Sequence, residues 1–363
     1  MSTFKGKKIL ITGHTGFKGS WLTQWLLLNG AEIFGISDQI PTDPSLFEIL
    51  KLEKKINHIL MDIRDKENLI NFIQEISPDF VFHLAAQPIV SLSYENPLET
   101  FEVNAVGTAN VLEGLRHLSN PCVGIFITSD KCYHNEEWVW GYRETDKLGG
   151  KDIYSASKAA AEIIFQAYFH SYFEKHPNVR IASVRAGNVI GGGDWALNRL
   201  VPDCMQSWSR GIKVEIRNPE STRPWQHVLE PLSGYLQLAA KLSKEKTLSG
   251  ESYNFGPRSE NNASVLSLLE KLSHYWNFQS NEKMVSFTQD KFFPEAGLLK
   301  LNCDKALAHL NWSPVFNLDE LARFTSEWYF LYYQNESEME KFTINQIKAY
   351  EELRNLNNKS CLF

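Results

Sequence analysis

Cysteine is scarce in this sequence, and long apolar runs are missing from it. The five cysteines are scattered without a CxxC spacing, and an odd number of such thiols favours neither a disulfide framework nor a metal site. No apolar run approaches the roughly 18 residues of a membrane span, and the lysine-rich start continues directly into a predicted strand instead of a signal-peptide core. We therefore expect a cytoplasmic protein with reduced thiols, no membrane anchor and no metal.

An excess of charge of one sign is also absent. The chain has 43 acidic and 37 basic residues, a net charge of −6, and no long basic stretch that could neutralise a nucleic-acid backbone. Nucleic acid is thus not an expected partner. The 363 residues, 43% of them hydrophobic, suffice for two domains or one large domain with a sizeable core.

The apolar residues that are present recur as short runs separated by helical patterns. Such alternation predicts an α/β fold, namely a Rossmann-type doubly wound parallel sheet with helices on both faces. The runs occupy residues 8–12, 33–37, 80–84, 124–128 and 180–185, and a further strand leads to Met61.

After about residue 187 the alternation breaks down into glycine-rich and proline-punctuated segments. We therefore expect residues 1–187 to form the dinucleotide-binding domain and residues 188–335 a smaller mixed α/β lobe that binds substrate. A helical pattern suggests that the first domain takes back a segment at about 228–250, so that the two parts interleave. Residues 336–363 are polar and contain a predicted helix that serves packing or oligomer contacts.

Three glycines follow the first predicted strand with the spacing Gly13-x-x-Gly16-x-x-Gly19 and precede a helical pattern. Strand, glycine turn and helix together are typical of a site where a dinucleotide pyrophosphate rests on a helix N-terminus, although the glycines alone would also suit an ordinary tight turn. Asp38 ends the second strand, where a carboxylate accepts hydrogen bonds from ribose hydroxyls. Because residues 37–44 contain no Arg or Lys for a 2′-phosphate, NAD is favoured over NADP.

Two polar clusters stand about two dozen residues apart. The segment TSDK, residues 128–131, ends a run of β-formers, and Tyr154 and Lys158 lie one helical turn apart on one face. An ammonium near a phenol favours phenolate, so we expect Lys158 to lower the pKa of Tyr154 and make it a base for a sugar hydroxyl. The Tyr-x-x-x-Lys pattern is short, and its position after a strand is what gives it weight.

These segments resemble those of extended short-chain dehydrogenases/reductases, and specifically of CDP-glucose 4,6-dehydratases. The resemblance spans most of residues 7–315. The glycine and Tyr/Lys motifs identify only the superfamily, whereas TSDKCY and RPWQHVLEPLSGYL are more specific. The matching segments are GHTGFKGSW (13–21), TSDKCYHNEEWVWGYRETDKLGGKDIYSASKAAAE (128–162), RAGNVIGGGDW (185–195), IRNPESTRPWQHVLEPLSGYL (216–236) and NFGP (254–257).

The resemblance implies an NAD-dependent lyase. Such enzymes oxidise C4 of the glucose ring, remove the C5 proton and the C6 hydroxyl, and return the hydride to C6, so that CDP-D-glucose becomes CDP-4-dehydro-6-deoxy-D-glucose and water. It also implies a place in deoxysugar biosynthesis, including that of lipopolysaccharide O-antigens. Many members pair through helices, and the apolar helix predicted over 155–170 is suited to a homodimer of this kind.

Where the related dTDP-glucose dehydratases have an Asp-Glu pair, this chain has Asp130-Lys131. The resemblance implies that Asp130 is the acid, Lys131 the base and Ser129 a hydrogen-bond partner of the C4 oxygen. A base role needs a depressed pKa for Lys131, which we expect from burial and from the nearby cation Lys158. Both side chains reach one sugar only if the chain leaves regular strand geometry, so a bend is predicted at residue 130. A solvated pair of loop charges is the alternative interpretation.

The resemblance also implies contacts with the cofactor. Asp62 and Ile63 follow the third strand and resemble the adenine contact, although Asp62 would also suit a helix N-cap. Ala85 and Ala86 resemble the floor beneath the dinucleotide, although close packing alone would explain them. The further implied contacts are Phe17, Leu84, Asn104 and Thr128, besides Gly13, Gly16, Gly19, Asp38, Tyr154 and Lys158.

At the nucleotide-sugar end, Arg223 falls where extended members carry an arginine that grips the substrate pyrophosphate. Asn188 resembles a second diphosphate contact, although it would also cap a turn. The further implied substrate contacts are Arg199, Arg217, Trp225 and His227. Structural alternatives stay open, since Trp225 would also fill core and Arg217 would also be a surface charge.

Two other functions stay open. A nucleotide-sugar 4-epimerase uses Tyr154 and Lys158 without elimination, and the Asp130-Lys131 pair is the feature that discriminates against it. A non-catalytic dinucleotide sensor would keep the glycine turn and lose the chemistry, and the intact Tyr154 and Lys158 argue against it. CDP-glucose as a small-molecule substrate and NAD as cofactor are therefore the leading expectations.

Overall fold

The computed structural model describes residues 2–216, 218–258, 263–276, 285–287 and 298–360. Its central sheet has seven parallel strands in the order β11-β6-β5-β4-β1-β2-β3. The strands are β1 (Lys8–Thr12), β2 (Glu32–Ser37), β3 (Asn57–Leu60), β4 (Phe80–His83), β5 (Cys122–Ile127), β6 (Val179–Arg185) and β11 (Ser252–Asn254). The predicted parallel Rossmann-type sheet is confirmed, and β11 is added to the strands that the apolar runs indicated.

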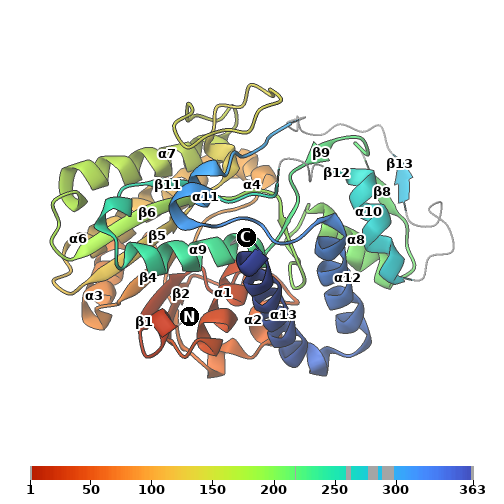
Figure 1. Ribbon diagram of the computed structural model, residues 1–363, viewed down its shortest axis with the longest axis horizontal. Coiled ribbons are helices and arrows are strands. Elements are labelled where there is room, and N and C mark those ends of the chain that lie inside the picture. Colours follow the sequence, from red (N-terminus) through yellow and green to blue (C-terminus); the bar gives the residue numbers. More distant parts are fainter. Residues whose placement is uncertain (1, 217, 259–262, 277–284, 288–297, 361–363) are drawn as a thin grey trace.

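Helices cover both faces of this sheet, which explains why its central strands are apolar along their whole length. Every residue of β4 and of β5 is buried. Figure 1 shows the two helical layers, and their side chains belong to two separate apolar clusters. One layer consists of α3 (Lys66–Ile76), α6 (Gly107–Arg116) and α7 (Ile153–Tyr168), and the other of α1 (Phe17–Leu28) and α9 (Leu229–Leu242). α9 packs against β5 and β6, so the chain returns to the central sheet near residue 228, as predicted.

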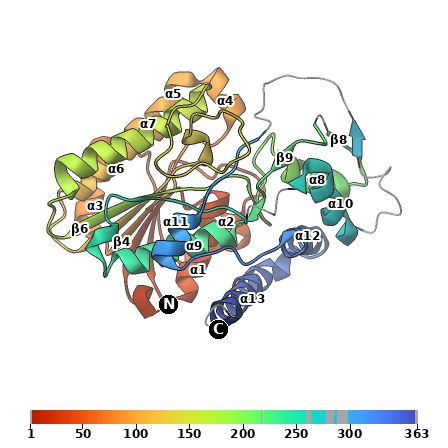
Figure 2. The same cartoon turned by 45° about the horizontal axis from the view of Figure 1, so that its top comes forward.

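The second lobe is built from short elements that gather to one side of the sheet (Figure 2). β7 pairs in parallel with β10, β8 pairs in parallel with β13, and β9 pairs antiparallel with β12. These elements are β7 (Val189–Ile190), α8 (Leu200–Ser209), β8 (Val214–Ile216), β9 (Thr222–Arg223), β10 (Gln226–His227), β12 (Ala263–Ser264), α10 (Val265–Ser273), β13 (Val285–Phe287) and α12 (Leu318–Gln334). One apolar core continues from α1 through α9 to α10 and α12, so the domain boundaries at 187 and 335 stay a prediction.

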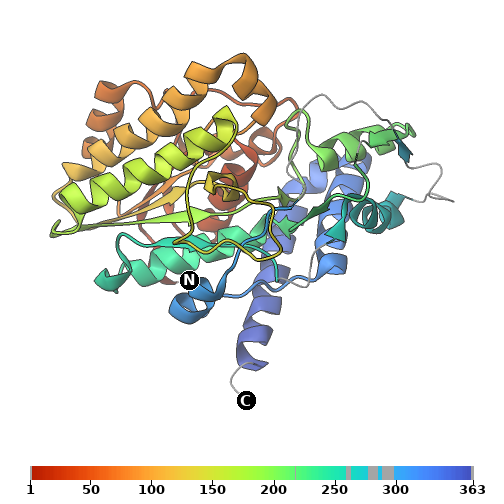
Figure 3. The same ribbon diagram turned by 90° about the horizontal axis from the view of Figure 1, so that it is seen from above.

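The polar C-terminal segment forms α13 (Met339–Ser360), which packs against α12 and α1 (Figure 3). Its Tyr350 is fully buried, and Trp25 of α1 donates its indole hydrogen to Glu351 at 2.6 Å. The helix predicted in this segment is confirmed, and one of its roles is packing within the chain. The remaining helices are α2 (Leu46–Ile49), α4 (Val90–Glu95), α5 (Pro97–Phe101) and α11 (Asp304–Leu310). Among the described residues, no helix combines the length and the apolar character that crossing a membrane requires.

Candidate active site

The turn between β1 and α1 leaves no room for side chains at two of its glycines. At Gly13, φ is +76°, and a Cβ would lie 2.7 Å from the backbone nitrogen of Ala85. A Cβ on Gly19 would lie 2.1 Å from the carbonyl oxygen of Gly13. Gly16 precedes α1 without a capping side chain, so no side chain competes for the N–H groups of the first helical turn. The tight turn predicted from the spacing is confirmed, and its role in binding stays a prediction.

Asp38 follows β2 and is exposed at the same edge of the sheet. Two contacts hold the glycine turn against the end of β2. The Ser37 hydroxyl lies 3.1 Å from Nδ1 of His14, and Thr15 donates its hydroxyl hydrogen to the carbonyl of Gln39 at 2.7 Å. The chain is thus fixed on either side of Asp38, while its carboxylate faces solvent.

Asp62 lies beyond β3 and is held by Arg64. The Nη2 atom of Arg64 lies 2.6 Å from Oδ2 of Asp62, and these hydrogen bonds keep the pKa of Asp62 below its usual range. The N-cap of α3 is Asp65, so the alternative interpretation of Asp62 as a helix cap is wrong. Ile63 is buried in the apolar cluster beneath α3 and α6.

Residues 84–86 follow β4 and are half-buried, as a floor beneath a ligand would be. Asn104 lies next to this segment, and it is 1% exposed. Its Oδ1 accepts a hydrogen bond from the backbone of Gln87, and its Nδ2 donates to Ser157 of α7 at 2.9 Å and to the carbonyl of Gln87 at 3.1 Å. Both amide hydrogens are thus used within the protein, so Asn104 braces the floor against α7.

The chain turns sharply where β5 ends. Ser129 is extended, with φ −150° and ψ 155°, and Asp130–Cys132 form a short 3₁₀ turn, η4. The Ser129 hydroxyl accepts a hydrogen bond from the backbone of Lys131 at 3.3 Å and donates to Oδ1 of Asp130 at 3.0 Å. The bend predicted at residue 130 is confirmed.

This turn separates the environments of Asp130 and Lys131. Asp130 is 2% exposed, and its Oδ2 lies 1.7 Å from where a Cβ of Gly187 would stand. Lys131 is exposed. The burial expected for Lys131 is therefore wrong. A 3₁₀ turn rotates successive side chains by about 120°, so burying Asp130 leaves its neighbour at the surface.

Tyr154 and Lys158 lie at the start of α7, which Asp152 caps by accepting a hydrogen bond from the backbone of Ser155 at 2.9 Å. Both side chains are buried. Burial raises the pKa of Tyr154 to about 12, although its contact with the Ser129 hydroxyl opposes the rise. The expectation of a lowered pKa for Tyr154 is wrong for this structure, because loss of hydration outweighs the neighbouring charges. Burial, and after it the charge of another lysine, lowers the pKa of Lys158 to about 8.

That other lysine is Lys18, which the glycine motif does not predict to be part of the site. It lies in the first turn of α1 and is half-buried. Burial and the charge of Arg199 lower the pKa of Lys18 to about 8, whereas Asp130 and Asp194 act in the opposite direction. The signal in the sequence was a single charged side chain in an otherwise uncharged first turn, FKGS.

Arg199 brings the second lobe to the same site. It is the N-cap residue of α8, and its Nη1 lies 2.8 Å from Oδ2 of Asp194. The charge of Arg199 lowers the pKa of both Tyr154 and Lys18. Arg199 therefore lies near the phenol as well as near the glycine turn. The structure thus brings Arg199 together with the residues of η4 and α7.

Two other predicted substrate contacts lie beside or on short strands of the second lobe. Asn188 has φ +49°, and its carbonyl accepts a hydrogen bond from the backbone of Gln226 at 3.2 Å. This conformation supports the interpretation of Asn188 as a turn residue, and its half-buried side chain also allows a ligand contact. Arg223 is half-buried on β9. Arg217 lies outside the described residues.

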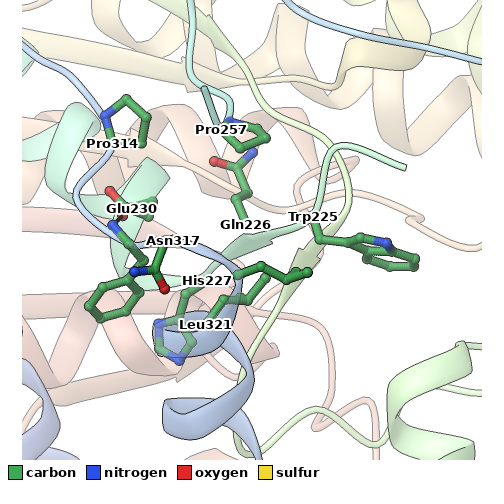
Figure 4. Close-up of a pocket in the computed structure, with 10 residues that line it drawn as sticks. Trp225, Gln226, His227, Glu230, Pro257, Pro314, Asn317 and Leu321 are labelled. Carbon is green, nitrogen blue, oxygen red and sulfur yellow. Dashed lines mark hydrogen bonds between the residues drawn. The ribbon is translucent and has the colours of Figure 1, made fainter. Parts of the chain in front are cut away.

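Trp225 and His227 point into the protein instead. His227 is fully buried, and burial lowers its pKa to about 3, so the ring is neutral. Both residues line a small cavity of about 10 Å³, which also reaches Glu230 and Pro314. Figure 4 shows the Trp225 ring pointing away from Glu230 within this cavity. The burial of Trp225 supports its interpretation as a core residue, and His227 is buried as well.

Comparison with known proteins shows the family. Residues 10–325 match the model of a family described as GDP-mannose 4,6 dehydratase. The chain belongs to this family. The CDP-glucose 4,6-dehydratase of Salmonella typhimurium is 47% identical over 331 residues, which cover 90% of this chain and 91% of that protein. The dTDP-glucose 4,6-dehydratase of Haemophilus influenzae is 25% identical, over 88% of this chain and 97% of that protein.

Solved structures share the fold. An epimerase from Methanothermobacter thermautotrophicus has a TM-score of 0.78 at 22% identity, over 93% of this chain and 96% of that one. A dTDP-glucose 4,6-dehydratase from Bacillus anthracis, in complex with NAD, has a TM-score of 0.74 at 20% identity, over 93% of this chain and 100% of that one. The fold class predicted from the sequence is confirmed by these structures.

Proposed function

We propose that this protein is a CDP-glucose 4,6-dehydratase, an NAD-dependent lyase that converts CDP-D-glucose to CDP-4-dehydro-6-deoxy-D-glucose and water. One observation carries the proposal, which is that Asp130 and Lys131 share a single turn beside the buried pair of Tyr154 and Lys158. An epimerase needs only the second pair, whereas the loss of water also needs an acid and a base. The 47% identity to the Salmonella typhimurium enzyme favours the same substrate.

The glycine turn fits a dinucleotide, because it is a cradle that a Cβ at Gly13 or Gly19 would fill. In this proposal the N-terminus of α1 holds the pyrophosphate, Asp38 the adenosine ribose and Lys158 the nicotinamide ribose. When bound, NAD accepts a hydride from the sugar and later returns it. The exposed carboxylate of Asp38 disfavours a 2′-phosphate, so we propose NAD in preference to NADP.

Each proton transfer has a candidate residue. The phenolic oxygen of Tyr154 takes the proton of the C4 hydroxyl, while Ser129 donates a hydrogen bond to the C4 oxygen. Arg199 offsets part of the rise in the pKa of Tyr154 and so favours this uptake. The ketone at C4 acidifies the C5–H, whose proton Lys131 removes, and Asp130 gives its proton to the departing C6 oxygen. A hexose bound against η4 covers the exposed Lys131.

We propose that the substrate diphosphate lies between the two lobes, with Arg223, Arg199 and Asn188 as its contacts. A planar guanidinium binds two phosphate oxygens at once, which suits both arginines to this role. The choice of cytosine as the base comes from the relative of known name and not from any residue of this chain. Comparing CDP-glucose with dTDP-glucose and GDP-mannose as substrates tests that choice.

We also propose a homodimer that pairs through α7 and the helices beside it. α4 and α5 contact α7, and apolar side chains are exposed along this surface, with Leu98 77% and Ile163 58% exposed. Exposed apolar side chains on packed helices support an interface at this surface. Light scattering should give a particle twice the 41.6 kDa of one chain, and Ile163→Glu should reduce it to a monomer. A monomeric wild-type protein would contradict the proposal.

We also propose that the protein is located in the cytoplasm. The cysteines among the described residues are all free, and three of the four are buried. Free thiols are typical of a reducing compartment. The product, a 4-keto-6-deoxy sugar nucleotide, is a precursor for deoxysugar synthesis.

The test of the function is to incubate the pure protein with CDP-glucose and NAD and to measure the absorbance of the product in alkali. A 4-keto-6-deoxy product gives an enone-type absorbance, which the product of a 4-epimerase does not give. Turnover to an epimer would favour the epimerase, and binding of NAD without turnover would favour a dinucleotide sensor. Tyr154→Phe is the matched control, since it removes only the phenolic oxygen.

A further inference from the structure

A buried ion pair lies beneath the η4 turn. The Nη2 atom of Arg185, at the end of β6, lies 2.8 Å from Oε2 of Glu162 on α7, and the two side chains are 3% and 0% exposed. Burial raises the pKa of Glu162, but Arg185 and hydrogen bonds from Thr128 and Ser183 outweigh this and keep it below its usual range. The pair is therefore charged, and none of the proton transfers proposed above uses it.

This ion pair holds both ends of the η4 turn. Thr128, two residues before the turn, donates its hydroxyl hydrogen to Oε1 of Glu162. Tyr133, the residue that follows the turn, accepts a hydrogen bond from Nη1 of Arg185 at 2.7 Å, and the guanidinium carbon lies 4.9 Å from the centre of its ring. Tyr133 in turn donates its hydroxyl hydrogen to Oδ1 of Asn254, on β11, at 2.8 Å. The turn is thus fastened to the sheet on both sides.

The same ion pair belongs to the helix that carries the other reactive residues. Glu162 lies on α7, one helical turn beyond Lys158 and two turns beyond Tyr154. Arg185 lies two residues before Gly187, whose missing side chain makes room for Asp130. A displacement of the pair would therefore move η4 relative to the start of α7.

We propose that Glu162 and Arg185 are positioning residues that set the placement of Asp130 and Lys131, on η4, relative to Tyr154 and Lys158, on α7. The inference rests on the proposed function, because only a reaction with an elimination step needs both pairs aligned on one sugar ring. A misplacement of about 1 Å can cost about 10²-fold in rate. Oxidation at C4 uses Tyr154 and Lys158 of α7 and Ser129, which precedes the turn, whereas removal of the C5 proton uses Lys131 within the turn and is the step most sensitive to its displacement.

The test removes one hydroxyl at each end of the turn and leaves every charge in place. Thr128→Val and Tyr133→Phe should each lower kcat for CDP-glucose about 10- to 100-fold, and Tyr133→Phe, which changes no predicted cofactor contact, should alter KM and NAD affinity less than about 2-fold. The kinetic isotope effect with CDP-[5-²H]glucose should rise above that of the wild type, and the effect with CDP-[4-²H]glucose should fall. Replacing Glu162 or Arg185 is avoided, because either change leaves a buried charge unpaired.

Ser183→Ala is the matched control. Ser183 donates to Oε2 of the same carboxylate at 2.9 Å, but it lies on β6 and contacts Ser252 of β11 instead of the turn. This variant should keep the kcat and the isotope effects of the wild type. Wild-type isotope effects in Thr128→Val and Tyr133→Phe would overturn the proposal, and so would an equal loss of kcat in Ser183→Ala. If the wild-type protein gave no enone from CDP-glucose, the proposed function would fail first, and this inference with it.

Discussion

The carboxylate of Asp130 fills the space beside Gly187 in which any larger residue would place its side chain. A Cβ at Gly187 would lie 1.7 Å from Oδ2 of Asp130, which is closer than non-bonded atoms approach. Gly187→Ala should therefore turn Asp130 out of its position and lower kcat for CDP-glucose by about 10²-fold or more, while the protein stays folded. Enone formation measures the rate, and thermal unfolding monitored by circular dichroism checks the fold.

Gly256→Ala is the control for this change. It lies in the same part of the molecule, and its added Cβ would meet its nearest neighbour, the Cβ of Leu301, at 3.4 Å, which is an ordinary contact. Activity near that of the wild type is expected for this variant. A Gly187→Ala protein with unchanged kcat would show that the position of Asp130 does not matter for the reaction.

The role of Lys131 can be separated from cofactor binding. Lys131→Met should leave NAD affinity unchanged, because its side chain is exposed on η4, but it should stop removal of the C5 proton. Incubation in D₂O followed by mass spectrometry of the sugar measures the exchange at C5. Lys147→Met, which changes an exposed lysine on the loop after η4, should exchange normally. Normal deuterium incorporation in Lys131→Met would remove Lys131 from the base role.

The parts of the site that sequence reasoning predicted correctly depend on local geometry. The glycine spacing determines a tight turn whatever surrounds it, and two side chains that must reach one sugar require a bend after β5. The three-residue β11 escaped notice because SYN has no apolar run, and its place depends on pairing with β6, a strand far away in the sequence.

The incorrect expectations concern hydration, which a sequence does not reveal. Lys158 was expected to lower the pKa of Tyr154, but burial of the phenol is the largest effect and raises it, and the cation that opposes the rise is Arg199. Lys131 was expected to be buried because a base role needs a depressed pKa, but the 3₁₀ turn that buries Asp130 leaves Lys131 exposed. Lys18 occupies an x position of the motif Gly13-x-x-Gly16-x-x-Gly19, which specifies no side chain. Its place among the charges of the site is visible only once α1 is placed against η4 and the second lobe.

NAD binding should weaken as the pH rises through about 8. Both Lys18 and Lys158 have pKa values lowered to about 8, so each loses its positive charge in that range and attracts the dinucleotide less. Fluorescence titration at pH 7 and pH 9 should show Kd for NAD increasing on the order of 10-fold, since each lost charge contact is worth about 1 kcal/mol. Lys18→Met should flatten this dependence, and Lys5→Met, at an exposed position, should not.

Unfolding does not explain such a loss of affinity. The folded-state pKa of each lysine lies below its ordinary value of 10.5, so between about 8 and 10.5 the unfolded chain binds more protons. The contribution of these groups to stability therefore rises with pH over that range. An NAD affinity that stays constant between pH 7 and pH 9 would remove both ammonium groups from cofactor binding.

Glu230 should make the stability of the protein depend on pH in the acidic range. Its carboxyl group is 1% exposed, accepts hydrogen bonds from the backbones of Val315 and Phe316 at 2.8 and 2.6 Å, and accepts another from Tyr350 of α13 at 2.7 Å. Burial raises its pKa from 4.5 to about 7. Between these values the folded state binds more protons than the unfolded state, so stability falls as the pH rises, by up to about 3 kcal/mol.

Glu230→Gln should remove this dependence. The amide oxygen can still accept from both backbone N–H groups, the amide nitrogen can donate to the Tyr350 hydroxyl, and the side chain cannot ionise. Urea unfolding should find the variant close to the wild type at pH 5 and more stable than it at pH 8. Glu230→Ala, which leaves buried donors without an acceptor, should be destabilised at both values by about 2–4 kcal/mol. A difference between Glu230→Gln and the wild type that did not grow with pH would show that burial does not raise the pKa of Glu230.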